Sequence, residues 1–170
     1  VSHINSNFLQ YVMEDRAGGI WVSSEYTGIS HLTVLNEGAL RIFPENENLS
    51  NRANAVRMIA KMKNGDIWAG TRQGGLYTFD YEMTPIGEKQ YFQSSIYAVV
   101  EDDEGQVWYG SRSKGIKVNN RWYTYSSLDS TSLSNNSIFA LCKDKKGRMW
   151  VGTFGGGLNL AIKKEDRYIF

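Results

Sequence analysis

The sequence predicts an all-β protein built from four consecutive copies of a four-stranded antiparallel unit. Two observations lead to this prediction. A block of about a dozen residues with a central tryptophan occurs four times in the 170 residues, and the tryptophans are spaced by 47, 40 and 42 residues. In every copy a glycine lies three residues before the tryptophan and another lies seven residues after it. A period of this size is characteristic of repeat architectures.

We interpret the repeated residues as structural. They are the tryptophans Trp21, Trp68, Trp108 and Trp150, preceded by Gly18, Gly65, Gly105 and Gly147 and followed by Gly28, Gly75, Gly115 and Gly157. Burial of one tryptophan ring contributes several kcal/mol, at roughly 25 cal/mol per Å² over about 200 Å². We therefore expect Trp68→Ala or Trp108→Ala to unfold the array, and we expect the glycines to let the backbones of neighbouring units approach closely.

Each unit divides into four expected strands. The first strand is apolar at nearly consecutive positions, which fits a strand buried on both faces; periodicity alone leaves a helix open, but the short length and the flanking glycines favour a strand. The second strand carries the tryptophan, the third begins near the following glycine, and the fourth is rich in aromatic residues. The expected ranges are 8–13, 56–60, 96–100 and 138–142 for the first strand, 20–23, 67–70, 107–110 and 149–152 for the second, and 39–43, 89–92, 121–125 and 167–170 for the fourth.

A polar turn joins the first two strands of each unit. Asp15, Asp102 and Asp144 occupy the same position in this turn, whereas the second copy has Met62 there. An aspartate that accepts hydrogen bonds from its own turn, followed by a glycine with positive φ, makes a tight hairpin. The carboxylates at 101–104 do not have the spacing of an EF-hand calcium loop. We interpret the segment as a turn.

Four antiparallel strands every 40 to 47 residues are typical of one blade of a β-propeller. Residues 1–170 are expected to form a single propeller segment with blades at about 6–43, 54–92, 94–125 and 136–170, the first strand innermost. Helical solenoids do not fit because the apolar pattern lacks a 3.6-residue period, and β-helix coils are shorter than this repeat. Two of the connections between blades contain Leu-Ser-Asn, at 49–51 and 133–135.

The composition argues against several classes of protein. There are 19 basic and 18 acidic residues, scattered along the chain, so no strong field favours nucleic acid or an anionic membrane. No apolar run is long enough to span a bilayer. Cys142 is the single cysteine and lies in an apolar run, where we expect it to be buried. His3 and His31 are too few for a metal site, and we expect neither a metal nor a cofactor. We also expect the chain, which begins at Val1, to be part of a longer protein.

The repeated block resembles a known family. Its pattern, an apolar strand followed by E-D-x-x-G-x-[IV]-W-[VA]-G-T-x-x-G-G-[LI], is similar to the two-component regulator propeller repeat. The resemblance covers residues 6–170, and the copy at 144–158 matches best. The first copy departs with Ser23-Ser24 in place of Gly-Thr, and the second lacks the turn aspartate. The resemblance implies the periplasmic part of an inner-membrane hybrid histidine kinase, which responds to oligosaccharides and controls glycan-utilisation genes.

We find no catalytic motif and expect this segment to bind rather than to catalyse. In propellers the loops between the second and third strands emerge on one face around the axis. Here they carry arginine and glutamine donors beside aromatic rings, which suit the hydroxyls and ring faces of sugars. The expected ligand-binding residues are Tyr26, Arg72, Gln73, Arg112 and Phe154. The other interpretation of these residues is that they are solvated turn residues.

Four blades are fewer than the seven-bladed rings that the resemblance implies, so an apolar flank is expected at each end. Large exposed apolar patches signal association, and two copies of the chain could close an eight-bladed ring as a homodimer. Other functions stay open at this stage: a propeller lyase or hydrolase acting on a glycan, or a structural propeller that binds proteins. A transmembrane helix and a kinase domain in the full gene would separate a sensor from these.

Overall fold

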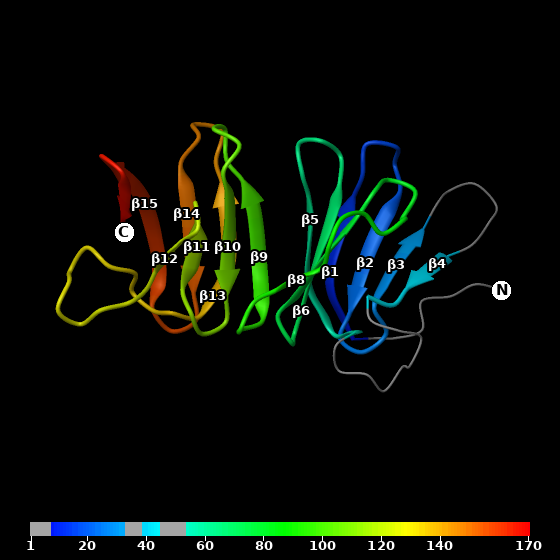
Figure 1. The fold of residues 1–170 in the computed structure, drawn as a ribbon, viewed down its shortest axis with the longest axis horizontal. Coiled ribbons are helices and arrows are strands. Elements are labelled where there is room, and N and C mark those ends of the chain that lie inside the picture. The colour runs from blue at the N-terminus through cyan, green and yellow to red at the C-terminus, as the bar shows by residue number, and fades with distance from the viewer. Residues whose placement is uncertain (1–7, 33–38, 45–53) are drawn as a thin grey trace. The chain divides into compact units, whose positions relative to one another are not determined.

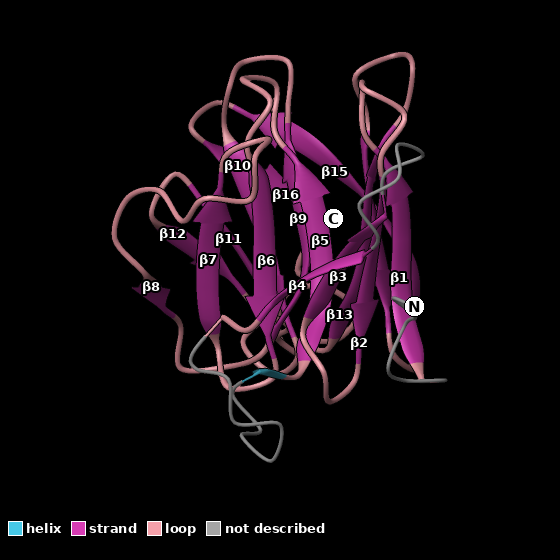
Figure 2. Ribbon diagram, turned by 90° about the vertical axis from the view of Figure 1, so that its right-hand side faces the viewer, coloured by secondary structure: helices cyan, strands magenta, loops and turns pink. Residues whose placement is uncertain are grey.

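The computed structural model describes residues 8–32, 39–44 and 54–170, which form strands joined by turns and loops (Figure 2). The chain divides into two compact units, Val1–Ser95 and Ile96–Phe170, and each contains two four-stranded sheets (Figure 1). Within the described ranges no helix is both long and apolar enough to cross a bilayer. The expectation of one continuous propeller segment over 1–170 stays a prediction.

Every sheet is an antiparallel meander whose strands follow the order of the sequence, as expected for a propeller blade. Unit 1 contains blade 1, with β1 (Leu9–Glu14), β2 (Ile20–Ser24), β3 (Ile29–Leu32) and β4 (Ala39–Ile42), and blade 2, with β5 (Val56–Lys61), β6 (Ile67–Thr71), β7 (Gly75–Phe79) and β8 (Gln90–Tyr91). Unit 2 contains blade 3, with β9 (Ile96–Glu101), β10 (Val107–Ser111), β11 (Ile116–Val118) and β12 (Arg121–Tyr123), and blade 4, with β13 (Ile138–Lys143), β14 (Met149–Thr153), β15 (Gly157–Lys164) and β16 (Arg167–Ile169). The sixteen strands of the described residues lie within a few residues of the expected ranges.

The turn between the first two strands has the predicted geometry and one bond that the sequence did not predict. Asp144 Oδ1 accepts the backbone N–H groups of Lys146 and Arg148, at 2.9 and 3.0 Å. Its other oxygen accepts the indole Nε1–H of Trp150 at 3.0 Å. The same bond joins Trp21 to Asp15 and Trp108 to Asp102, at 2.8 and 2.9 Å. The turn aspartate therefore fixes both its own hairpin and the tryptophan ring of the next strand.

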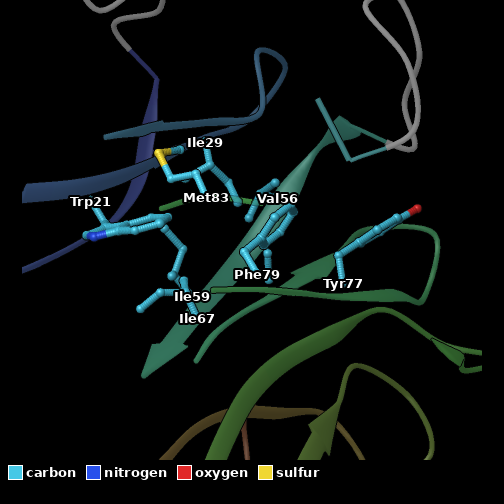
Figure 3. Packing of buried hydrophobic residues seen from close by; sticks show 9 residues of the cluster. Trp21, Ile29, Val56, Ile59, Ile67, Tyr77, Phe79 and Met83 are labelled. Atoms are coloured by element: carbon cyan, nitrogen blue, oxygen red, sulfur yellow. The ribbon is translucent and has the colours of Figure 1, made fainter. Parts of the chain in front are cut away.

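Burial separates the four tryptophans of the repeated block into two pairs. Trp21 and Trp108, in the first blade of each unit, are fully buried against the second blade. In unit 1, Trp21 packs with Ile59, Ile67 and other residues of blade 2 (Figure 3). Trp68 and Trp150 hold the same position in the second blades and are only partly buried. The predicted packing of tryptophan between blades is thus confirmed for Trp21 and Trp108.

The first strands differ from the prediction in half of the blades. β5 and β9 are largely buried, but β1 and β13 are mostly exposed. Val12 in β1 and Ile59 in β5 each pair with the residue that follows the repeated tryptophan of their blade. Val12 is 56% exposed, whereas Ile59 is 3% exposed and packs against Trp21. Uncovered apolar side chains therefore occur in blade 1 and in blade 4, at Val12 and Leu158.

The prediction that Cys142 is buried was wrong, because this thiol is exposed. Cys142 pairs with Trp150 across β13 and β14, in the way that Val100 pairs with Trp108 in blade 3. Val100 packs against the core of unit 2. Cys142 belongs to the second blade of the unit, where no further blade covers this face. The apolar run was read correctly as a strand, but its environment depends on a neighbour.

In blades 1 to 3 glycine is required where the third strand begins, for a reason different from the one expected. A Cβ at Gly115, whose φ is 74°, would lie 2.0 Å from the carbonyl oxygen of Tyr123 in the fourth strand of the same blade. Gly28 approaches the carbonyl of Ile42 in the same way, and in blade 2 the residue concerned is Gly74 rather than Gly75. The close approach lies within a blade, not between neighbouring blades. Gly110 does provide an approach between blades, because a Cβ there would meet the side chain of Ile138.

The connection between blades 3 and 4 is anchored through its Leu-Ser-Asn sequence. Leu133 is buried, and the backbone N–H of Ser134 donates to Asn159 Oδ1 at 3.0 Å. Asn135 accepts the backbone N–H of Ser137 at 2.8 Å and so shapes the entry into β13. The other copy of this sequence, at 49–51, lies outside the described residues, as does His3.

Candidate ligand-binding site

A β-bulge occurs at the start of the first strand in all four blades. In blade 4, Ile138 pairs with Thr153 and Ala140 with Gly152, which leaves Phe139 as the extra residue. The corresponding extra residues in blades 1, 2 and 3 are Gln10, Arg57 and Tyr97. Bulges of this kind re-aim a side chain and are common next to functional sites. Because the first strand starts where the second strand ends, each bulge lies at the same end of its blade as the loop between the second and third strands, which we call the 2–3 loop.

The five predicted ligand-binding residues lie in these 2–3 loops, and all of them are wholly or partly exposed. The side chains of Arg72, Gln73 and Arg112 make no hydrogen bond or ion pair with other described residues. The backbone of Arg72 is fixed, because its N–H donates to the carbonyl of Ala55 at 2.8 Å. These side chains therefore have free hydrogen-bonding capacity on a firmly held loop.

In unit 1, a bulge residue and a 2–3 loop form an ion pair between blades. The guanidinium Nη2 of Arg57, in blade 2, lies 3.1 Å from the Glu25 carboxylate in the loop of blade 1. Both side chains are mostly buried. This pair fixes the loop that carries the predicted residue Tyr26, whose ring remains about half exposed.

In unit 2, the bulge residues and a 2–3 loop form a row of aromatic rings. Phe154, the predicted residue in the loop of blade 4, stacks on Phe139 with ring centroids 5.3 Å apart and an interplanar angle of 28°. Phe139 meets the edge of Tyr97, in blade 3, at 4.8 Å and 80°. Phe139 and Phe154 are 48% and 68% exposed. We call Tyr97, Phe139 and Phe154 the aromatic row.

Sequence reasoning found Phe154 but missed Tyr97, Phe139 and Arg57. These three residues were assigned to strands that were expected to be buried, and a bulge leaves no mark in the hydrophobic pattern. The signal that was available is their alignment: the second residue of the first strand is Gln, Arg, Tyr and Phe in the four copies. This position varies in chemical type among the four copies of an otherwise regular repeat.

The geometry of the aromatic row suits a ligand with flat apolar faces and peripheral polar groups. Two exposed rings supply a platform, and the free guanidinium of Arg112 lies in the 2–3 loop of the other blade of the same unit. In the described ranges no group of three or more His, Cys, Asp or Glu side chains could hold a metal ion. The row and Arg112 supply stacking and hydrogen bonding, which orient a ligand.

Comparison with known proteins agrees with this architecture. Residues 132–155 match the family model of the two-component regulator propeller. This stretch includes β13, β14 and the start of the 2–3 loop of blade 4, and it overlaps the copy at 144–158 that fits the family pattern best. No curated protein matches the sequence significantly.

Solved structures resemble the chain in its fold. The extracellular domain of the hybrid two-component system BT4673 from B. thetaiotaomicron aligns with a TM-score of 0.78 and 21% identity over 94% of this chain and 22% of that domain. The extracellular domain of the system BT3049 from the same organism aligns at 0.56 and 21% over 92% of this chain and 27% of that domain. Virginiamycin B lyase from Staphylococcus aureus aligns at 0.65 and 12% over 98% of this chain and 59% of the lyase.

The four sheets and these likenesses define the chain as a β-propeller segment with four blades. Residues 132–155 match the two-component regulator propeller repeat, which confirms the resemblance noted in the sequence for that stretch. The chain spans about a fifth of the length of the BT4673 domain.

Proposed function

We propose that the chain is the ligand-sensing propeller segment of a hybrid two-component sensor, on the periplasmic side of the inner membrane. The ligand is an oligosaccharide, and its binding regulates genes for glycan use. The family repeat and the fold shared with extracellular domains of hybrid two-component systems support the sensor role. The likeness to virginiamycin B lyase concerns the fold, so we propose binding rather than catalysis for this segment.

The aromatic row carries the oligosaccharide part of the proposal. Sugar rings present C–H faces that pack on aromatic rings, and their hydroxyls take hydrogen bonds from a few placed polar groups. Phe139 and Phe154 supply exposed ring surface, although exposed phenylalanines are costly unless something covers them. Arg112 supplies donors from the neighbouring blade of unit 2.

A thermal-shift screen of the chain tests this function, with neutral oligosaccharides of two to eight units as probes. A binding oligosaccharide should raise the melting temperature, because it binds the folded state alone. Phe139→Ala and Phe154→Ala should each abolish that shift. Tyr125→Ala is the matched control, since Tyr125 is also about half exposed in unit 2 but is not part of the row. A shift that survives both phenylalanine variants would refute the role of the row.

The arginines are tested in the same assay. We expect the double variant Arg72→Ala/Arg112→Ala to lose the ligand-induced stabilisation, because both guanidinium groups are exposed and unpaired within the described residues. The variant should melt at the temperature of the original chain when no oligosaccharide is present. An undiminished shift would show that these residues are solvated turn residues.

A further inference from the structure

A second concave site lies in unit 1, at the opposite end of the blades from the 2–3 loops. It is a pocket of about 470 Å³ beside the turn that joins β1 and β2. Trp21 and Ile67 form its floor, and residues of the turns and of blade 2 form its walls and rim. We propose that this pocket binds an anionic saccharide unit, a sugar ring with a carboxylate or sulfate group. This proposal rests on the proposed function and adds a second subsite.

The matching region of unit 2 is filled by a side chain. Tyr168 of β16 packs edge-on against Trp108, with centroids 4.5 Å apart, and its hydroxyl donates to Gln106 Oε1 at 3.0 Å. Gln106 lies four residues after the turn aspartate of blade 3, and the residue at that position in blade 1 is Gly19. Gly19 lines the pocket. The chain therefore closes this place with a tyrosine in one unit and leaves it open in the other.

The wall of the pocket is built from a fixed carboxylate and an imidazole. Asp15 Oδ1 accepts the N–H groups of Ala17 and Gly19, and Oδ2 accepts the Trp21 indole. His31 stacks on Trp21 at 4.5 Å and 29°, and its Nε2 lies 3.3 Å from Asp15 Oδ2. A Cβ at Gly19 would come within 2.2 Å of that Nε2, so glycine provides the room for His31.

The bonding capacity of Asp15 is already used, and this determines which ligand the pocket can accept. Burial raises the pKa of Asp15, but the bonds from Trp21, Gly19 and Ala17 outweigh burial and lower it, so the group stays charged and saturated. His31 Nε2 is buried and has no hydrogen-bond partner among the described residues. Asp15 and the buried Nε2 therefore offer little to a ligand, and the groups that can bond to one lie on the rim of the pocket.

The rim supplies two cations and a ring face. Arg16 and Lys61 line the pocket and make no ion pair with other described residues. Tyr81 is 74% exposed, and its hydroxyl donates to Glu82 Oε1 at 2.9 Å, which leaves the face of the ring for stacking. Hydrogen-bond donors thus exceed acceptors, and an aromatic face stands beside them. A sugar ring with an anionic substituent matches both features, because its oxygens accept and its C–H face stacks.

Ligand-observed NMR titrations of the 170-residue chain test the proposal with D-glucuronate, D-glucose 6-sulfate and D-glucose. We expect the two anionic sugars to bind and glucose to bind at least about tenfold more weakly, because glucose lacks the anionic group that accepts charge-assisted hydrogen bonds. The relative affinities of glucuronate and glucose 6-sulfate identify the anion that the pocket prefers. Equal binding of glucose, or no binding of either anionic sugar, would overturn the proposal.

Two variants locate the binding. Arg16→Ala/Lys61→Ala should weaken binding of the anionic sugars at least about tenfold. Lys145→Ala is the matched control, because Lys145 follows the turn aspartate of blade 4 as Arg16 follows that of blade 1. Tyr81→Ala removes the ring face at the rim, and it should also weaken binding while the melting temperature is retained, because Tyr81 is 74% exposed. Unchanged affinity in both variants would place the anion elsewhere.

The two sites can fail separately. Phe154→Ala should leave binding of the anionic monosaccharides to unit 1 unchanged, because Phe154 belongs to unit 2. If the anionic sugars do not bind but an oligosaccharide still gives a thermal shift that depends on Phe154, the second subsite is refuted and the proposed function stands. If the monosaccharides bind and no oligosaccharide acts through the row, the proposed function is refuted instead.

Discussion

The indole Nε1–H of Trp150 donates to the carboxylate of Asp144, which lies 3.0 Å away and six residues earlier in the chain. The carboxylate also accepts two N–H groups of its own turn and bonds to Arg148 Nε at 2.6 Å. A residue that the sequence assigns to a turn thus also sets the orientation of the ring in the next strand. The second blade lacks this relationship, because Met62 holds the position of the aspartate.

The turn aspartates predict that stability depends on pH. The hydrogen bond from Trp150 lowers the pKa of Asp144 well below 3.8; burial opposes this shift, and bonds from Arg148 and Lys146 support it. In Asp15, burial raises the pKa, but the hydrogen bonds that the carboxylate accepts outweigh burial and lower it. A carboxyl whose pKa is depressed by folding stabilises the folded state above the unfolded pKa. That contribution is lost as the pH falls below 3.8 through the folded pKa.

Chemical denaturation between pH 2 and pH 7 measures this effect. The free energy of unfolding should fall with pH below about 4, and Asp15→Asn/Asp144→Asn should flatten the decline. Asp129→Asn provides a comparison: Thr131 lowers the pKa of this loop carboxyl, but Asp129 holds no tryptophan. A decline as steep in the Asp15/Asp144 double variant as in the original chain would contradict the assignment.

Tryptophan removal should have effects that follow burial. Trp108→Ala empties a fully buried site in unit 2 and should cost about 3 to 5 kcal/mol, enough to unfold much of the unit. Trp150 is only partly buried, so Trp150→Ala should cost clearly less. Thermal melting followed by near-ultraviolet circular dichroism compares the two. Equal losses of stability in the two variants would show that Trp108 and Trp150 are equally buried in solution.

Alanine substitutions at two glycines separate backbone strain from steric clash. Gly105 and Gly115 both have positive φ, at 79° and 74°. At Gly105 the nearest atom to an added Cβ is 4.0 Å away, so Gly105→Ala should cost about 1 to 2 kcal/mol from the left-handed conformation alone. Gly115→Ala adds the contact with the Tyr123 carbonyl and should cost substantially more. Urea denaturation of both variants measures the difference, and similar midpoints would exclude the clash.

The uncovered blade faces predict self-association of the chain. Leu158 in blade 4 is 67% exposed, whereas Ile116, at the same place in blade 3, is 0% exposed. Val12 is exposed on the outer face of blade 1. Light scattering of the 170-residue chain should show a dimer, and Val12→Asp/Leu158→Asp should be monomeric because a charge cannot be buried there without a partner. A soluble monomer of the original chain would refute ring closure by a second copy.

The strands could be predicted from the sequence because the same residue pattern occurs in four copies. The tryptophan and its glycines place the second strand and both of its turns, and the structure confirms these positions within a few residues. Burial was harder to predict. Cys142 and Val100 occupy equivalent positions, yet only Val100 has a neighbouring blade to cover it. Burial here is a property of the assembly, and a single strand's pattern does not contain it.

The candidate site was predicted in part. Phe154 was found because it lies in a loop, where a large exposed ring is unusual. Phe139 was missed because it lies in a strand, and only the register of that strand with its partner shows that Phe139 is unpaired in the sheet. The Asp15–His31 wall of the pocket was missed for another reason: the two residues are 16 positions apart, and the hairpin fold brings them together.

The recurring bulge places one extra residue at the same position in all four blades. Its extra residue is glutamine, arginine, tyrosine or phenylalanine, and the strands on either side keep their pairing in every case. Substitutions at this position can therefore change what the end of a blade recognises while the strand pairing is kept. An engineer can use the same four positions to direct the segment toward a new ligand.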